Sequence, residues 1–194
     1  MQSVCVFCGS NTGADAAYAE AARAVARAIV AAGCRLVYGG GSIGLMGVLA
    51  DAALAARGTV IGIAPRRLLE REVVHRGLAE LRVVETMLER KTLMAELSDA
   101  FIALPGGFGT LDELFEMLTW TQLGFQRKPC GLLNVAGYYD GLTGFLDHAV
   151  AQRFVMREHR DMLLVEKDPA VLLERLRSQP IPEVNKWLDR KPAT

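Results

Sequence analysis

The 194-residue sequence predicts an α/β fold: a Rossmann-like, doubly wound parallel sheet flanked by helices, in a single domain. Short apolar runs alternate with longer helical patterns, and strands separated by helices form parallel sheets with right-handed crossovers. The length, with 51% hydrophobic residues, suits one sizeable core. Glycine-rich turns follow three of the apolar runs, as expected where strands lead into helices.

The elements follow one another without a linker or repeat. Strands are expected at 4–7, 35–38, 60–64, 81–85, 101–104 and 131–135. Helices are expected at 16–32, 45–56, 87–97, 111–123, 139–153 and 169–177, with a short apolar piece at 163–165. Charged residues 66–79 are expected to form a helical loop over the site. The domain is therefore placed at 1–179, and residues 180–194, which hold three prolines, are expected to be a C-terminal tail.

Charge and hydropathy exclude several classes of partner. The 22 basic and 22 acidic residues give a net charge of zero, and no basic stripe is visible, so no nucleic-acid partner is expected. No apolar run is long enough to span a bilayer, so no membrane partner is expected. Residues 1–8 lack the charged and apolar regions of a signal peptide, which favours a cytoplasmic protein.

Cys5 and Cys8 form a lone C-x-x-C pattern. A zinc site would need further ligands at suitable spacing, and the three histidines of the chain are scattered. We therefore expect no metal, and we expect Cys5 to lie in a buried strand and Cys8 in the turn that follows it.

Three turns lie where strands are expected to end, at 8–11, 39–47 and 105–110. Glycine lets backbone N–H groups approach an anion, and the start of the next helix adds its positive dipole end. A phosphate is the expected ligand, although a glycine-rich turn can also serve only close packing. The chain has no G-x-x-x-x-G-K-[ST], and its first turn lacks G-x-G-x-x-G, so triphosphate and dinucleotide sites are disfavoured.

Charged residues stand beside these turns. Thr110 and Glu113 match a helix capping box, with Thr110 as N-cap, which offers a purely structural role for the glutamate. A carboxylate beside a phosphate would also face the ribose that the phosphate carries. Arg90 and Lys91 stand near the positive end of their helix, where cations are unfavourable; they form either a solvated cluster or contacts with an anion or carboxylate.

The sequence PGGFGTLDE at 105–113 resembles the P-G-G-x-G-T-x-x-E signature of the Lonely Guy family. Its members are cytokinin riboside 5′-monophosphate phosphoribohydrolases, often mislabelled as lysine decarboxylases. GGGSIGLMG at 39–47 is similar to the family's G-G-G-x-x-G-L-M-G, and MLERK at 87–91 is similar to its M-H-x-R-K. The resemblance covers nearly the whole chain. Leu88 stands where the family usually has His, and Asp112 where a first glutamate is common.

The resemblance implies that Arg90 and Glu113 are the catalytic pair. The implied substrate contacts are Glu72, Lys91 and Thr119, with Gly107, Gly109 and Thr110 holding the phosphate. The other candidate substrate-binding residues lie in the three turns and the helix after the third: Ser10, Gly40, Gly41, Ser42, Phe108, Leu111 and Asp112.

The implied reaction is hydrolysis of the N-glycosidic bond of a purine ribonucleoside 5′-monophosphate, releasing the base and ribose 5-phosphate, without a cofactor and in a homodimer. The base could be adenine or an N6-substituted adenine. Two alternatives stay open. One is a decarboxylase with pyridoxal phosphate on Lys91; the other is a non-catalytic nucleotide carrier or sensor that uses the same turns.

Overall fold

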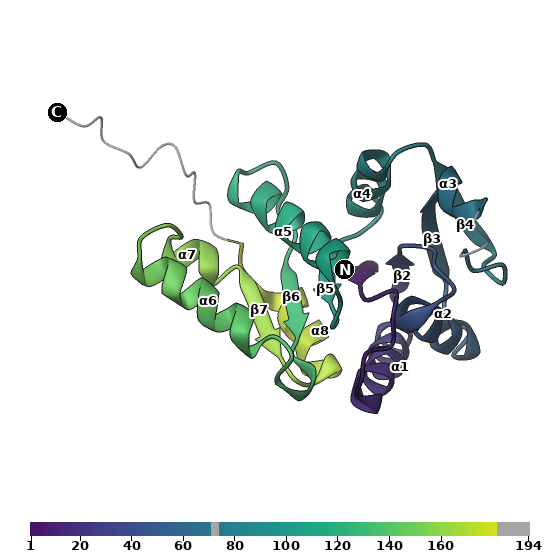
Figure 1. Cartoon of the computed structure of the whole chain (residues 1–194), viewed down its shortest axis with the longest axis horizontal. Coiled ribbons are helices and arrows are strands. Elements are labelled where there is room, and N and C mark those ends of the chain that lie inside the picture. Colours follow the sequence, from purple (N-terminus) through teal and green to yellow (C-terminus); the bar gives the residue numbers. More distant parts are fainter. Residues whose placement is uncertain (71–73, 182–194) are drawn as a thin grey trace.

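In the computed structural model, which describes residues 1–70 and 74–181, all seven strands lie in one parallel sheet of order β4-β3-β2-β1-β5-β6-β7 (Figure 1). The strands are β1 (Ser3–Phe7), β2 (Arg35–Tyr38), β3 (Val60–Pro65), β4 (Glu80–Val84), β5 (Ala100–Ala103), β6 (Cys130–Leu133) and β7 (Leu163–Glu166). The predicted fold class is confirmed. The short apolar piece expected near residue 163 is the seventh strand, paired with β6.

The helices connect and cover these strands: α1 (Ala16–Ala31), α2 (Gly44–Ala55), α3 (Arg66–Leu69), α4 (Met87–Glu96), α5 (Phe108–Gln122), α6 (Asp140–Ala151), α7 (Arg157–Arg160), α8 (Pro169–Ser178) and the 3₁₀ turn η1 (Val135–Gly137). Within the described ranges, no helix has both the length and the hydropathy for a membrane crossing. The tail expected at 180–194 lies almost wholly outside the described residues.

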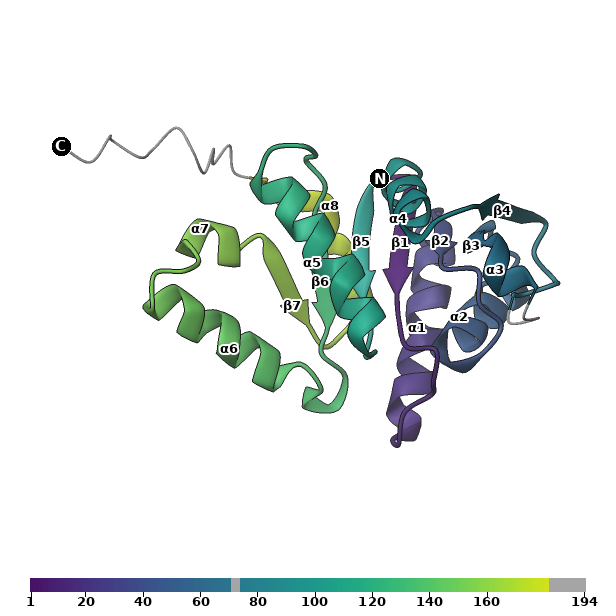
Figure 2. The same cartoon turned by 45° about the horizontal axis from the view of Figure 1, so that its top comes forward.

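Helices cover both faces of the sheet (Figure 2). Buried residues of α1, α2 and α8 form one core with side chains such as Leu36 and Tyr38, while α4 and α5 form a second core with Val37 and Phe101. The two sides of each strand thus enter different cores, because successive side chains of a strand point to opposite faces. Cys5 and Cys8 are divided between the two cores, so both serve packing, as expected from the sequence.

The strand order reverses at the centre of the sheet. The chain adds β2, β3 and β4 on one side of β1, then returns to place β5 on the other side of β1. In open parallel sheets the crevice at such a reversal, beyond the carboxyl ends of the strands, is the usual ligand site. The turns after β1 and β5 meet there, since the Gly9 N–H donates to the Pro105 carbonyl at 3.0 Å.

The start of α5 corrects the predicted capping box. The helix begins at Phe108, with Gly107 as N-cap and no side-chain cap hydrogen bond, so Thr110 and Glu113 lie inside the helix. The capping pair of this kind lies in α4, where the Thr86 hydroxyl accepts from the Glu89 N–H at 3.1 Å and the Glu89 carboxylate accepts from the Glu85 N–H at 2.9 Å. The capping role predicted for Glu113, which was the structural alternative to a catalytic role, is therefore wrong.

Candidate active site

A cavity of about 250 Å³ opens between the turns after β1 and β5. Its walls are backbone-rich, and its lining includes Gly9, Ser10, Asn11, Thr12, Gly106, Gly107, Tyr18 and Tyr138. The Tyr138 hydroxyl donates to the Gly106 carbonyl at 2.6 Å, which holds one wall of the cavity in place. Of the residues predicted to bind substrate, Ser10 and Gly107 meet at this cavity.

The start of α5 is open to a ligand. A Cβ added at Gly107 or Gly109 would meet no atom within 4 Å. The side chain of Phe108 between them is 94% exposed, while Thr110 is buried against Gly106. With no side-chain cap, the first N–H groups of this 15-residue helix face outward with the positive end of its dipole. This helix start is suited to an anion such as phosphate.

The turn after β2 is instead filled by the protein itself. A Cβ at Gly44 would lie 2.2 Å from the Ser10 backbone, and a Cβ at Gly47 would lie 2.2 Å from the Ser42 carbonyl oxygen. Gly40 and Gly44 also have positive φ angles of 72° and 60°. The candidates Gly40 and Gly41 are buried, and Ser42 is exposed. Close packing alone accounts for most glycines of this turn, so it is a weaker phosphate cup than the start of α5.

Arg90 is a buried arginine that crosses under the ends of two strands. Its Nε donates to the Ile63 carbonyl at 3.1 Å and its Nη2 to the Gly39 carbonyl at 3.2 Å. Its Nη1 donates to Oε1 of Glu113 at 3.0 Å. These bonds use three of the five guanidinium N–H groups and fix the plane of the side chain.

Glu113 occupies an inward-facing position of α5, on the same buried stripe as Thr110, Leu114 and Met117. Burial raises the pKa of its carboxyl group, and the Arg90 guanidinium opposes that rise only in part. Among the described residues, the hydrogen bond of this carboxylate is the one that Oε1 accepts from Arg90. A buried, paired carboxylate beside an open helix start is an arrangement typical of catalytic sites.

Lys91 lies between α4 and α5, with its Nζ 2.9 Å from Glu116 and 3.1 Å from Asp112. Burial lowers the pKa of this ammonium, but the Glu116 and Asp112 carboxylates outweigh that effect, and the pKa is raised. A Schiff base with pyridoxal phosphate needs a neutral amine. Lys91 is therefore poorly suited to the decarboxylase alternative.

One predicted contact is not brought to this site. Thr119 is exposed, its hydroxyl donates to the Phe115 carbonyl at 2.6 Å, and it lines a separate groove between α5, α6 and α7. Glu72 lies outside the described residues. Leu111 is partly buried in the core under α5, and Asp112 is exposed apart from its ion pair with Lys91.

Sequence reasoning missed Gly39. A Cβ on this residue would lie 1.8 Å from Nη2 of Arg90, so only glycine leaves room for the guanidinium. A usable signal was present: Arg90 interrupts the buried face that Met94 and Ala95 continue on α4, and a buried charge needs partners and room beside it.

The central crevice, the open start of α5 and the buried ion pair define a class: a doubly wound α/β protein with a ligand site at the reversal of strand order. A family model described as "Possible lysine decarboxylase" matches residues 46–176. A cytokinin riboside 5′-monophosphate phosphoribohydrolase of Rhodococcoides fascians is 48% identical over 91% of this chain and 90% of its own length. The enzyme LOG of Oryza sativa is 44% identical over 97% of this chain and 79% of its own.

The chain belongs to this family of cytokinin riboside 5′-monophosphate phosphoribohydrolases, and it is a hydrolase. The molybdenum cofactor binding protein of Rippkaea orientalis has the same fold, with a TM-score of 0.70, 22% identity and coverage of 92% of this chain and 97% of its own. A molybdenum cofactor carrier protein of Chlamydomonas reinhardtii has a TM-score of 0.68 at 20% identity, covering 92% and 99% of the two chains.

Proposed function

We propose that the protein hydrolyses the N-glycosidic bond of purine ribonucleoside 5′-monophosphates, with adenine or an N6-substituted adenine as the base. The products are the free base and ribose 5-phosphate. The observation that carries the proposal is the 3.0 Å pair of Arg90 and Glu113, buried beside the open start of α5. Simple retention of a phosphate needs no carboxylate there, which argues against the carrier or sensor alternative.

The phosphate would bind at the N–H groups of Gly107 to Thr110, with Ser10 on the facing turn. Binding there supplies energy that orients the rest of the nucleotide. The ribose would then extend towards Glu113. In the same arrangement Lys91, held by Asp112 and Glu116, lies between α4 and α5.

The bond between C1′ and N9 would break with its electron pair leaving on the purine, while positive charge grows on the ribose. The Glu113 carboxylate would stabilise that charge and accept a proton from the water that attacks C1′. Arg90 has two roles open to it: holding Oε1 of Glu113, or stabilising the negative charge on the departing base. The purine takes up a proton from solvent as it leaves, and Glu113 later returns to solvent the proton that it took from water, so atoms and charge balance.

Chromatography of the released base tests the proposal. The enzyme is incubated with AMP, with isopentenyladenosine monophosphate and with adenosine. Turnover of a monophosphate with little turnover of adenosine is expected, because the phosphate provides orientation. Equal rates with adenosine and AMP would contradict the role of α5, and absence of base from every nucleotide would favour the carrier alternative.

We also propose a cytoplasmic homodimer without nucleic-acid or membrane partners. Phe145 and Phe154, whose sequence neighbours Leu146 and Val155 line the groove that holds Thr119, are 64% and 87% exposed, which supports burial of this surface by a second copy. If Thr119 contacts substrate, as the family resemblance implies, it would reach the site of that copy. The four cysteines are unpaired, in keeping with a reducing compartment. Sedimentation at micromolar concentration measures the mass, and a monomer would contradict the dimer.

A further inference from the structure

A short segment after α3 lies against the turn that follows β2. Val74 forms an isolated antiparallel bridge with Gly41, and the His75 N–H donates to the Gly40 carbonyl at 2.9 Å. These contacts lie outside the main sheet. They tie the segment directly to the glycine turn beside the active site.

The side chain of His75 ties the same segment to α2. Its Nδ1 lies 3.1 Å from the Gly77 N–H, which can only donate, so Nδ1 accepts and Nε2 carries the ring proton. Nε2 then donates to Oδ1 of Asp51 at 3.0 Å. The imidazole is largely shielded, with 12% of its side-chain surface exposed, whereas Asp51 is 73% exposed.

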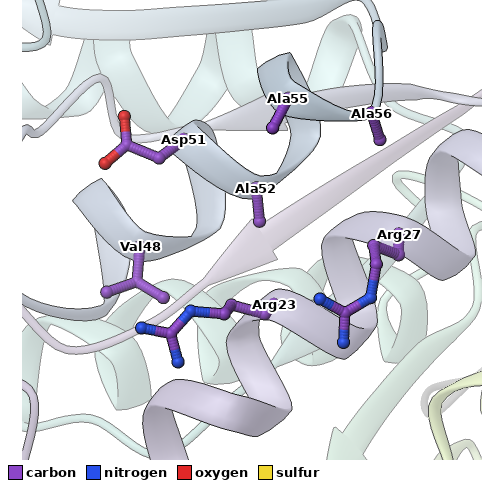
Figure 3. A pocket seen from close by; sticks show the side chains of 7 residues that line it. All are labelled: Arg23, Arg27, Val48, Asp51, Ala52, Ala55 and Ala56. Carbon is purple, nitrogen blue, oxygen red and sulfur yellow. The ribbon is translucent and has the colours of Figure 1, made fainter.

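Asp51 stands on α2 at the edge of an open cavity of about 490 Å³ between α1 and α2 (Figure 3). The figure shows Arg23 and Arg27 on α1, with the Asp51 carboxylate turned away from both. Arg23 pairs instead with Glu20 at 2.6 Å. The Asp51 carboxylate therefore bonds to the histidine, and these arginines provide matched controls that line the same cavity.

The glycine turn at 39–41 also contacts Arg90. The carbonyl of Gly39 accepts from Nη2 of Arg90 at 3.2 Å, and the Cα of Gly39 forms the wall against which the guanidinium lies. A shift of this turn would move both the acceptor and the wall. A misplacement of about 1 Å near reacting groups can cost roughly 100-fold in rate.

We propose that His75 is a positioning residue. Its hydrogen bond to Asp51 anchors the segment at 74–77 on α2; that segment holds the turn at 39–41, and the turn aims the guanidinium of Arg90 at Glu113. The catalytic part of this proposal rests on the proposed function. The anchoring itself does not, because it follows from contacts among residues that need not touch substrate.

Kinetics of base release separate the two contacts of the imidazole. In His75→Gln the amide nitrogen can still donate to Asp51, while in His75→Asn the amide oxygen can accept from Gly77 but the side chain is too short to reach Asp51. We expect His75→Ala, His75→Asn and Asp51→Ala each to lower kcat about 10-fold or more with a smaller change in KM. His75→Gln should stay within about twofold of the wild type, as should the control Arg27→Ala.

The double variant His75→Ala/Asp51→Ala tests whether the two residues act as one unit. Its loss of kcat should equal that of a single variant, because contacting residues are coupled. Multiplied losses, or a His75→Asn variant as active as the wild type, would overturn the proposal. Melting temperatures measured alongside show whether a variant has lost activity through unfolding alone, a result that would also overturn it.

Amide hydrogen exchange gives a readout that is independent of activity. The His75 N–H, which bonds to Gly40, should exchange about 10-fold faster or more in Asp51→Ala than in the wild type or in Arg27→Ala. Unchanged exchange would overturn the anchoring. If the wild type released no base, the proposed function would fail, while the exchange measurement would still decide whether the anchor exists.

Discussion

At the scale of single residues, the site depends on two charges placed where apolar side chains would normally pack. Arg90 and Glu113 are both buried, and each satisfies part of the other's need for a partner. Removing one partner of a buried ion pair is costly because the remaining charge has no compensation. The guanidinium is further fixed by backbone carbonyls, so its position depends on small residues around it as well as on Glu113.

Gly39 is the small residue on which Arg90 depends most closely. In Gly39→Ala the new methyl group would occupy the place of Nη2, so the guanidinium must move while the backbone keeps its conformation. We expect turnover to fall roughly 100-fold, a loss typical of one misplaced electrostatic group. Base release and circular dichroism measure the effect. Gly144→Ala, where the methyl group meets open space, is the control, and equal activity in both variants would contradict this role for Gly39.

The raised pKa of Glu113 predicts an acid limb in the activity profile. The carboxylate acts in its ionised form, which is lost as the pH falls through its pKa. Because burial raises that pKa above the ordinary value of 4.5, kcat/KM should decline at a higher pH than an exposed glutamate would give. A pH series of initial rates measures the limb. Full activity down to pH values below 4.5 would contradict an ionised catalytic Glu113.

At the scale of elements, the start of α5 can be tested for ligand binding without disturbing the packing of the protein. Gly109 is the second residue of α5, and Gly141 is the second residue of α6; a Cβ on either would meet nothing within 4 Å. Gly109→Val and Gly141→Val should therefore fold equally well. Only Gly109→Val should crowd a phosphate at the helix start, weakening ribose 5-phosphate binding by about 10-fold or more, a difference of about 1.4 kcal/mol.

Calorimetric titration of both variants with ribose 5-phosphate measures this difference. The melting temperatures of the two proteins check that the added side chains are tolerated alike. If Gly109→Val bound as tightly as Gly141→Val, the phosphate site would lie elsewhere, and the turn after β2 would be the next candidate.

At the scale of the whole molecule, the alternation of short apolar runs with helical patterns was sufficient to predict the doubly wound sheet, and the glycine-rich turns indicated the edge where the candidate site is placed. Each buried strand was located to within about two residues at its ends, because its apolar run is bounded by turn residues. The start of α5 was misplaced, since the Thr110 and Glu113 spacing matches a cap while the backbone begins the helix at the glycines before it.

Sequence patterns did not predict which side chains meet in the folded protein. The partners Arg90 and Glu113 are 23 residues apart, on helices whose packing the sequence does not specify locally. The same holds for His75 and Asp51, which are 24 residues apart in the sequence and in contact in the folded chain. The resemblance to a family supplied the identity of the first pair, but not the carbonyls of Gly39 and Ile63 that fix the arginine.

Base release and melting temperature of Glu113→Gln, measured together, test the central claim that Glu113 is a catalytic carboxylate. Glutamine keeps an oxygen that can accept from Arg90 but removes the charge that compensates the buried guanidinium, so the melting temperature should fall, and turnover is compared at a temperature where both proteins are folded. Glutamine carries no charge to stabilise the ribose cation, so turnover should fall about 10²–10³-fold, while the exposed control Glu96→Gln keeps wild-type turnover. A stable Glu113→Gln enzyme with near-wild-type turnover would contradict the account.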